Sequence, residues 1–323
     1  MTLLTQPLPC VGKNLSRPES VIATADGRLY ATDRRCGVVR VLPTQSTAVP
    51  LDIAVEGFTP NGIALLPDGS FLIANIGPTG GVWRLTAPGM VEPYITSLAG
   101  QKLYPTNFVE LDKQGRIWFT VSTRHLPREK AFRAGIRDGF VVCHEGGISR
   151  VVADHIEFCN EGRVAPDGKW FYVNETIGRR VTRFPILPEG GLGPREIFYQ
   201  FEGRGIFPDG LAFDAEGGVW VASVVSNRLI RIKDGVAAFI LEDCDDESVQ
   251  DVERSFSEGR LVRADIDLGA QWSLGNVSSL AFAGKDLKTI YLGSLFRQGL
   301  TELKSDVAGA PPVHWNFGPT VLD

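Results

Sequence analysis

The sequence predicts an all-β fold, a six-bladed β-propeller with a central metal channel, and three observations lead to it. The 323-residue chain contains 36 glycines and many short Val-, Ile-, Phe- and Trp-rich runs, a composition typical of strands joined by turns. One sequence pattern recurs six times at intervals of roughly 40–70 residues, the length of a four-stranded blade. These copies fill the chain, so we expect residues 1–323 to form a single β-propeller domain.

Each copy of the pattern predicts a strand, a tight turn and a second strand. A copy opens with Glu, Asn or Asp, continues through an apolar run, and reaches a glycine eight residues later. The DG, QG and EG pairs at these turns supply the positive φ that a tight hairpin needs. A β-sandwich with accidental internal similarity is the alternative, but six matches in one register favour the propeller. The opening residues are Glu19, Asn61, Asn107, Asn160, Asp209 and Asn276, and the turn glycines are Gly27, Gly69, Gly115, Gly168, Gly217 and Gly284.

Two segments, residues 123–139 and 242–259, interrupt the repeat and are predicted to be long connections with about one helical turn each. Long loops on a rigid scaffold often carry binding residues. The second segment contains "DCDDESVQD", which lacks the spacing and the glycine of an EF-hand loop, so we expect a solvated acidic loop there. The "HWNF" stretch at 314–317 is predicted to be an outer strand that helps to close the ring.

The register of the repeat predicts a ring of polar residues around the propeller axis. The first strand of each blade lines the central channel, so the six opening residues, four amides and two carboxylates, occupy equivalent positions there. Buried like charges are costly unless a cation lies between them. Oxygen ligands without thiolate or imidazole suit Ca²⁺ better than Zn²⁺ or Mg²⁺, although another divalent cation is possible. The alternative is that these residues cap strand ends or hydrogen-bond to channel water.

Charge and motif content exclude several classes of function. The net charge is −5 and no Lys/Arg-rich block occurs, so we expect neither nucleic acid nor a membrane as partner. The apolar runs are too short for a membrane span, and the amino-terminal segment lacks the features of a signal peptide, so the expected location is cytoplasmic. Five widely spaced cysteines without a CxxC are expected to be free thiols. Neither a GxSxG nor a GxxxxGK[ST] motif is present, which argues against a serine hydrolase of the α/β type and a P-loop NTPase.

The repeats resemble those of the SMP-30/gluconolactonase/luciferin-regenerating-enzyme family. The resemblance runs from "RPESVIATADGRLYATD" to "SSLAFAGKDLKTIYLGS" and is most specific in "NEGRVAPDGKWFYVNET" and "FPDGLAFDAEGGVWVAS". It implies a six-bladed propeller with a catalytic calcium, or another divalent ion, in the central channel. It also implies that the metal ligands are Glu19, Asn107, Asn160 and Asp209, although family members differ at Asn107, which could instead act through water or contact the substrate. Asn61 and Asn276 would then lie behind the ligands or face the substrate.

The resemblance further implies a hydrolase of lactones, esters or phosphorus esters, in which the metal polarises the carbonyl or phosphoryl oxygen. Asp209 is the candidate general base or nucleophile, because a coordinated carboxylate is ionised at neutral pH and keeps one oxygen free. Sugar lactonases of the family often carry an Arg two residues before the third-blade Asn and an Asp just after it, where this chain has Pro105 and Phe108. We therefore expect a small-molecule substrate less polar than a sugar lactone.

Three more residues are candidates for substrate binding. Tyr104 and Glu161 lie beside the ring in sequence, and His125 lies in the long third-blade connection, from which it could reach over the channel. Tyr104 and Glu161 could instead be buried between blades by strand alternation, and His125 could be a solvated loop residue.

These observations predict a calcium-dependent lactonase or esterase. A phosphotriesterase-like hydrolase on the same metal site is one alternative. A non-hydrolytic enzyme of the strictosidine-synthase type, which has no catalytic metal, and a non-catalytic binding propeller are two others. The complete ring of acids and amides argues against the last two.

Overall fold

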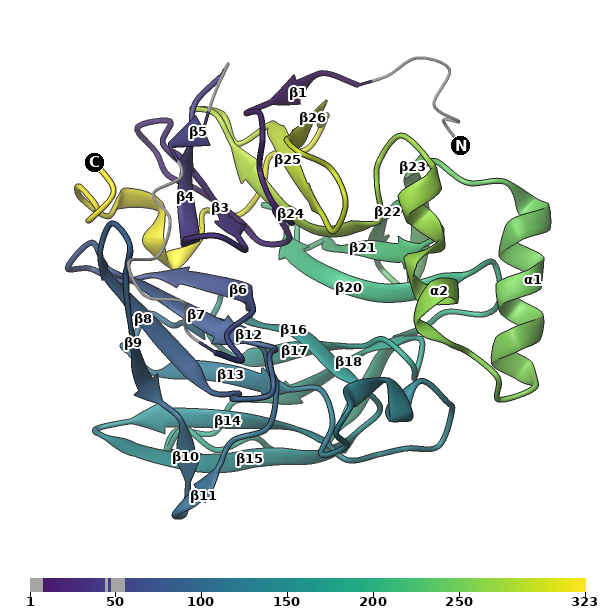
Figure 1. The fold of residues 1–323 in the computed structure, drawn as a ribbon, viewed down its shortest axis with the longest axis horizontal. Helices are drawn as coiled ribbons and strands as arrows, with labels where there is room; N and C mark the ends of the chain where they lie inside the picture. The colour runs from purple at the N-terminus through teal and green to yellow at the C-terminus, as the bar shows by residue number, and fades with distance from the viewer. Residues whose placement is uncertain (1–7, 44–45, 48–55) are drawn as a thin grey trace.

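Six four-stranded antiparallel sheets surround a central axis in the computed structural model, which describes residues 8–43, 46–47 and 56–323 (Figure 1). The predicted six-bladed β-propeller is therefore confirmed. Within each of the first five blades the strands pair in chain order, and the first strands of neighbouring blades contact one another around the axis. Residues 1–7, part of the segment assessed for a signal peptide, lie outside the described residues.

In every blade the first strand lies nearest the axis and the fourth lies at the rim. The first blade comprises β2 (Val21–Ala23), β3 (Leu29–Asp33), β4 (Gly37–Val41) and β5 (Ser46–Thr47). The second comprises β6 (Pro60–Leu65), β7 (Phe71–Asn75), β8 (Val82–Ala87) and β9 (Met90–Ile95). The third comprises β12 (Thr106–Leu111), β13 (Ile117–Val121), β14 (Gly139–Glu145) and β15 (Ile148–Ile156). The fourth comprises β16 (Cys159–Val164), β17 (Trp170–Glu175), β18 (Arg180–Pro185) and β19 (Glu196–Gln200). The fifth comprises β20 (Ile206–Phe213), β21 (Val219–Val225), β22 (Arg228–Lys233) and β23 (Val236–Glu242). The sixth comprises β24 (Val277–Ala283), β25 (Thr289–Ser294), β26 (Leu300–Lys304) and β1 (Cys10–Val11). A small hairpin of β10 (Ser97–Leu98) and β11 (Gln101–Lys102) follows the second blade.

The turns between the first and second strands fold as the repeat predicts. All six turn glycines adopt a positive φ, between 73° at Gly168 and 86° at Gly27, where a side chain would be strained. Asp112 and Asp214, each three residues before a turn glycine, accept a hydrogen bond of 2.8 Å from the indole N–H of a tryptophan on the next strand. The same local chemistry therefore builds equivalent hairpins in different blades.

The amino-terminal strand closes the ring. β1 pairs with β26, with Cys10 opposite Thr301 and Val11 opposite Leu300, so the sixth blade combines both ends of the repeat region. The prediction that residues 314–317 form an outer strand is wrong. Residues Val313–Asn316 form the 3₁₀ helix η3, directly after Pro311 and Pro312, which lack the N–H that a strand ladder needs. This segment lies across one end of the axis, in yellow in Figure 1.

The first long connection, residues 123–139, lies at the end of the axis away from η3 and contains one 3₁₀ turn, η1 (Arg128–Ala131), as predicted. The second connection differs from the prediction, because it contains the 12-residue helix α1 (Asp246–Ser257). In the structure this second connection continues past residue 259 to β24 and includes two more short helices, α2 (Arg263–Ile266) and η2 (Asp267–Gln271). Figure 1 shows α1 and α2 together on the right-hand side of the molecule.

The acidic stretch expected to be a solvated loop is the beginning of α1. The side chain of Asp245 accepts a hydrogen bond of 2.8 Å from the amide of Ser248, which caps the helix amino terminus. Val249 and Val252 are buried on its inner side. The acidic residues therefore stabilise a helix start, where negative charge is favoured.

Apolar side chains pack between neighbouring blades and fix the inner strands. Trp118 stacks on Phe171 across the third and fourth blades, with ring centroids 5.2 Å apart. Trp220 meets Phe282 edge-on across the fifth and sixth blades, at 5.3 Å.

None of the five cysteines forms a disulfide, as predicted. Within the part of the chain that the structure describes, no helix has the length and apolarity to cross a membrane.

Candidate active site

β-Bulges occur at the ring residues of the inner strands. In four inner strands the ladder register shifts across the ring residue, which is Asn61, Asn107, Asn160 or Asp209. A bulge bends a strand locally and re-aims the side chain at that position. The repeat therefore places its polar residue where the strand is least regular.

Glycines allow the bulged strands to pack closely against one another. A Cβ atom on Gly210, next to Asp209, would lie 2.5 Å from the Cα of Ser279 in the sixth blade. A Cβ atom on Gly62, next to Asn61, would lie 2.7 Å from the Cα of Phe108 in the third. These contacts require glycine, which explains the Asn-Gly and Asp-Gly pairs at the starts of these inner strands.

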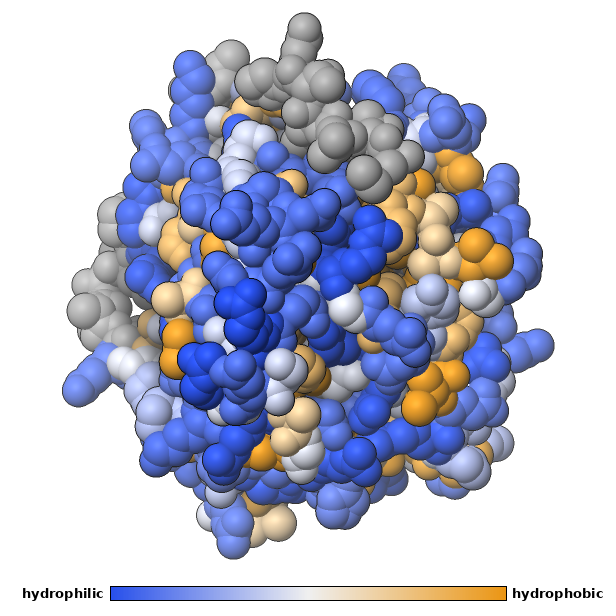
Figure 2. All heavy atoms as spheres, turned by 90° about the vertical axis from the view of Figure 1, so that its right-hand side faces the viewer, coloured by the Kyte–Doolittle hydropathy of each residue, from blue (hydrophilic) through white to orange (hydrophobic). Residues whose placement is uncertain are grey.

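The four residues predicted as metal ligands line one cavity of about 450 Å³, open space included. Glu19, Asn107, Asn160 and Asp209 contribute to its wall, and all four are buried, with at most 7% of their surface exposed. The cavity opens at the end of the axis that carries α2 and the connection with η1. Figure 2 looks onto this end of the molecule, where most of the surface is hydrophilic. The other lining residues are Arg17, Arg128, Phe132, Phe158, Thr176, Ile177, Val224, Arg263, Ile266 and Leu295.

The oxygen atoms of the ring suit a hard cation. The Oδ1 atoms of Asn107 and Asn160 are buried and accept no hydrogen bond from the described residues. Burial and the negative charges of Glu19 and Glu161 hold the pKa of Asp209 well above its ordinary range. Two carboxylates and two unsatisfied amide oxygens in one cavity are a stable combination when a cation lies between them.

Thiolate and imidazole are absent from this cavity wall. Across residues 8–43, 46–47 and 56–323, no three His, Cys, Asp or Glu side chains are grouped to hold a metal ion. The ring contributes only two carboxylates, so amide oxygens would have to complete the ligand set, and such a set favours calcium over zinc.

Asn61 and Asn276 do not line the cavity and instead bind protein groups behind it. Asn61 Oδ1 accepts a hydrogen bond of 2.9 Å from Arg17, and its Nδ2 donates one of 2.9 Å to the carbonyl oxygen of Asn107. Asn276 Oδ1 accepts from the amide of Val225, and its Nδ2 donates to the carbonyl oxygen of Ile266 in α2. Both side chains are therefore engaged with protein groups and do not contribute to the cavity wall.

The other three candidates for substrate binding also lie outside this cavity. Glu161 Oε2 accepts hydrogen bonds from the amide of Leu211, at 3.0 Å, and from Arg163, at 3.3 Å. Tyr104 packs against the apolar cluster between the second and third blades. His125 is half-exposed, and its Nε2 lies 3.8 Å from a carboxylate oxygen of Asp138.

Three arginines that the sequence analysis did not select as candidates line the cavity. Arg17 forms an ion pair with Glu19 and precedes it by two residues, a spacing visible in "RPES". Arg128 and Arg263 come from the two long connections, where no local pattern marks them.

The expectation of a less polar substrate depended on Pro105 and Phe108. Neither residue lines the cavity, and Phe108 is buried with the guanidinium of Arg163 4.6 Å from its ring centroid. The expectation of a less polar substrate stays a prediction, and the charged residues of the cavity wall are three arginines and two carboxylates.

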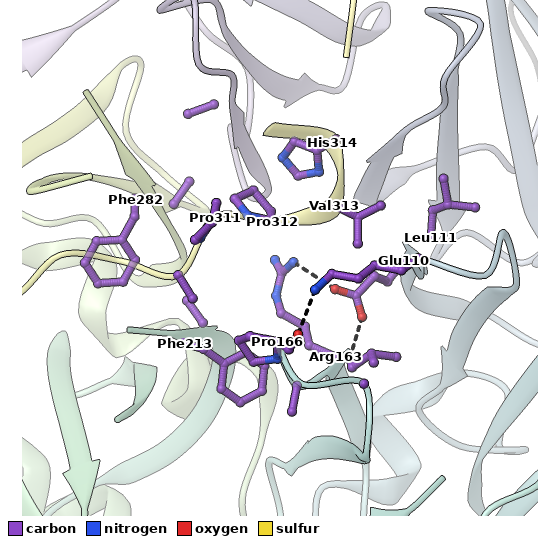
Figure 3. Close-up of a pocket in the computed structure, with 18 of the residues that line it drawn as sticks. Glu110, Leu111, Arg163, Pro166, Phe213, Phe282, Pro311, Pro312, Val313 and His314 are labelled. Atoms are coloured by element: carbon purple, nitrogen blue, oxygen red, sulfur yellow. Dashed lines mark hydrogen bonds and ion pairs between the residues drawn. The ribbon is translucent and has the colours of Figure 1, made fainter. Parts of the chain in front are cut away.

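A second cavity lies at the opposite end of the inner strands (Figure 3). It encloses about 820 Å³, open space included, and is bounded by the carboxyl-terminal segment with Pro311, Pro312 and His314. The ion pair of Glu110 and Arg163, with 3.7 Å between Oε1 and Nη1, lies in its wall. It is the larger cavity, but it contains none of the ring residues, so we place the candidate active site at the other end.

Comparisons with known proteins agree with this architecture. A model of the SMP-30/Gluconolactonase/LRE-like region matches residues 17–237. The 6-deoxy-6-sulfogluconolactonase of Pseudomonas putida is 27% identical over 289 residues, which are 85% of this chain and 79% of that protein. A gluconolactonase structure from Xanthomonas campestris is similar with a TM-score of 0.61 at 17% identity, over 93% of this chain and 94% of that chain. Regucalcin from Agrobacterium tumefaciens, described as a calcium-binding protein, has a TM-score of 0.59 at 17% identity, over 98% and 95% of the two chains.

Proposed function

The chain belongs to the SMP-30/gluconolactonase/LRE-like family, and from this premise we propose that it is a metal-dependent hydrolase of a small-molecule lactone or related ester. The observation that carries the proposal is the shared cavity of Glu19, Asn107, Asn160 and Asp209. These residues come from four different blades, and a structural core would not need two acids and two unsatisfied amides at one place. The Pseudomonas relative, named for a sulfo-substituted gluconolactone, supports a lactone as the substrate class.

We propose Glu19, Asn107, Asn160 and Asp209 as the ligands of a divalent cation, with calcium favoured. The buried Oδ1 atoms of Asn107 and Asn160 support this, because they have no protein donor. The description of the Agrobacterium relative as a calcium-binding protein agrees with the choice of ion. A bound calcium ion supplies positive charge that stabilises the negative charge developing on the carbonyl oxygen during hydrolysis.

We propose Asp209 as either the general base or the nucleophile of the reaction. As general base, its carboxylate takes a proton from a water molecule while the water oxygen bonds to the lactone carbonyl carbon. The ring C–O bond then breaks, the ring oxygen receives a proton, and the product is a hydroxy acid. As nucleophile, the carboxylate itself would bond to the carbonyl carbon, and water would release the acid from the resulting anhydride.

The test is acid release from a panel of lactones and aryl esters, measured first with calcium and then with a chelator. Hydrolysis that the chelator abolishes, and that Asp209→Asn lacks, is the expected result. The metal content of the purified protein is measured alongside, because it reports the metal site independently of the substrate. Calcium bound without hydrolysis of any panel member would overturn the hydrolase assignment, and chelator-resistant hydrolysis would overturn the metal dependence.

A further inference from the structure

Arg128 differs from the other two arginines of the cavity in lacking a carboxylate partner. Arg17 is paired with Glu19, and Arg263 with Asp267, at 2.8 Å. Within the described part of the chain, Arg128 forms one hydrogen bond and no ion pair. The bond is donated by its Nη2 to the hydroxyl of Ser122, at 3.0 Å. Its Nε is buried and has no hydrogen-bond partner. The residue as a whole is half-buried, and Glu19 and Asp209 attract it without forming a hydrogen bond to it. Donors of the guanidinium therefore remain available for an anion that enters the cavity.

The guanidinium of Arg128 is held in a fixed position. It lies 5.0 Å from the ring centroid of Phe158, another residue of the cavity wall. Ala131 and Phe132, which follow it at the end of the same 3₁₀ turn, belong to an apolar cluster that also includes Ile266 of α2. The two long connections are thus packed together over the cavity, and they present Arg128 and Arg263 to the same space. A guanidinium fixed before the ligand arrives loses less entropy on binding.

The charge balance of the cavity wall favours an anionic ligand. Three arginines and two carboxylates line it, and Asp267, just outside the wall, compensates the charge of Arg263. A divalent cation on the ring would therefore leave an excess of positive charge. Burial lowers the pKa of Arg128 to about 10, with a smaller contribution from Arg263, while Glu19 acts in the opposite direction. An anionic group on the ligand would stabilise the charged form of Arg128.

We propose that Arg128, with Arg263 beside it, binds an anionic substituent of the substrate, so that the enzyme prefers lactones carrying a sulfonate, phosphate or carboxylate. This inference depends on the proposed lactone hydrolysis for its substrate, but the anion site can be tested separately. The planar guanidinium fork suits a tetrahedral or planar oxyanion through paired N–H donors. Arg128 is thereby a specificity residue, distinct from the ring that performs the chemistry.

The experiment compares one neutral lactone with charged analogues of the same ring. The probes are glucono-1,5-lactone and its 6-phospho and 6-deoxy-6-sulfo derivatives, assayed with wild type, Arg128→Gln and Arg128→Lys. For wild type, kcat/KM is expected to be higher for at least one charged lactone, by about 10- to 100-fold. Arg128→Gln is expected to remove this preference, because kcat/KM falls by about 10-fold or more further for the charged lactones than for the neutral lactone. Arg128→Lys, which keeps the charge but not the fork, is expected to retain part of it.

The matched control is Arg133→Gln, an exposed arginine of the same connection, which is expected to behave as wild type. Equal losses on neutral and charged lactones in Arg128→Gln would overturn the inference, because they would place Arg128 in the reaction itself or in the fold. Equal wild-type kcat/KM for all three lactones would overturn it as well.

A binding measurement separates this inference from the proposed function. Calorimetric titration with 6-phosphogluconate, 6-deoxy-6-sulfogluconate and gluconate needs no turnover. Tighter binding of a charged acid by wild type, lost in Arg128→Gln, would support the anion site even if no lactone is hydrolysed. If the three acids bind equally, or if Arg128→Gln binds them as wild type does, the anion site is refuted whatever the activity.

Discussion

Asn160 and Thr176 are joined by a hydrogen bond of 2.9 Å from the amide Nδ2 to the hydroxyl oxygen, and this bond fixes which end of the amide is left free. The hydroxyl in turn donates to the carbonyl oxygen of Pro208, at 2.8 Å, one residue before Asp209. One threonine thus orients the Asn160 side chain and ties the fourth blade to the strand that carries Asp209. Asn160 Oδ1 is consequently the atom without a protein donor.

Thr176→Val should therefore weaken calcium binding at the proposed site without removing any of the proposed ligands. Loss of a group that orients a ligand typically costs about 10- to 100-fold in metal affinity or activity. Calorimetric calcium titration is the measurement, and Thr176→Ser, which keeps the hydroxyl, should restore most of the affinity. Equal calcium affinity in Thr176→Val and wild type would show that the hydroxyl does not position Asn160.

Asp209→Asn should abolish hydrolysis and leave the fold largely intact. The amide keeps the shape of the side chain but neither takes up a proton nor attacks a carbonyl carbon, so we expect a loss of at least about 100-fold in kcat. Steady-state kinetics on the best lactone of the panel measure this, and circular dichroism checks the fold. Turnover near the wild-type value in a folded variant would remove Asp209 from the proposed role.

Glu19→Gln should reduce the stabilisation that calcium provides. An ion that binds only the native state raises the melting temperature by mass action, and the neutral amide is a weaker ligand than the carboxylate. The rise in Tm on adding calcium should be smaller in the variant, whereas Glu157→Gln, which alters a buried carboxylate paired with Arg137 elsewhere, should keep the full rise. Comparing the calcium-induced shifts removes the effect of the lost ion pair with Arg17, and identical shifts would count against Glu19 as a ligand.

The sequence predicted the blades well because their signals are local. The turn glycines and the alternating apolar runs act within one hairpin, so the positions of inner strands follow from the repeat alone. Four of the six residues that the register assigns to one ring, Glu19, Asn107, Asn160 and Asp209, line one cavity. Ring closure by β1 was missed, since a strand of two residues, Cys10–Val11, carries no readable pattern.

The cavity wall was harder to predict than the ring. Arg128 and Arg263 reach the cavity only because an apolar cluster packs the two long connections together, which is a tertiary effect. The helix α1 had a readable signal in the spacing of Val249, Val252 and Phe256, but the acidic residues before it were interpreted as a loop. The positions of the ring residues were therefore more predictable from the sequence than the rest of the cavity wall.

Gly210→Ala should destabilise the protein because the inner strands meet closely at this residue. Its Cβ atom would lie 2.5 Å from the Cα of Ser279 and 2.6 Å from the carbonyl oxygen of Ser278, and backbone atoms cannot turn away. Overpacking of this kind costs about 1–3 kcal/mol in the free energy of unfolding. Gly191→Ala is the control, because the added Cβ makes only ordinary contacts, at 3.7 Å. Denaturant unfolding of both variants checks this, and equal stability would mean that the sheets adjust easily.

Glu110→Gln should change how stability depends on pH. Burial raises the pKa of Glu110 to about 7, and the charges of Asp112 and Glu161 add to the rise. The charge of Arg163 and the hydrogen bond from the Val164 amide lower the pKa and compensate only in part. The unfolded chain loses this proton near pH 4.5, but the folded protein holds it until about pH 7. The contribution of Glu110 to stability is therefore complete below pH 4.5 and is lost as pH rises through 7, by roughly 3 kcal/mol.

Gln has no proton to lose and can still accept the hydrogen bond from the Val164 amide, 2.6 Å long in the wild-type protein. The free energy of unfolding of Glu110→Gln minus that of wild type should thus be constant below about pH 4.5 and increase up to about pH 8. Urea unfolding across this range measures the difference, in which the titration of all other groups largely cancels. The exposed Glu92, changed to Gln, should give a flat difference. A flat or falling curve for Glu110→Gln would show that this carboxyl is ionised in the folded protein at ordinary acidic pH, with the charge of Arg163 outweighing the cost of burial.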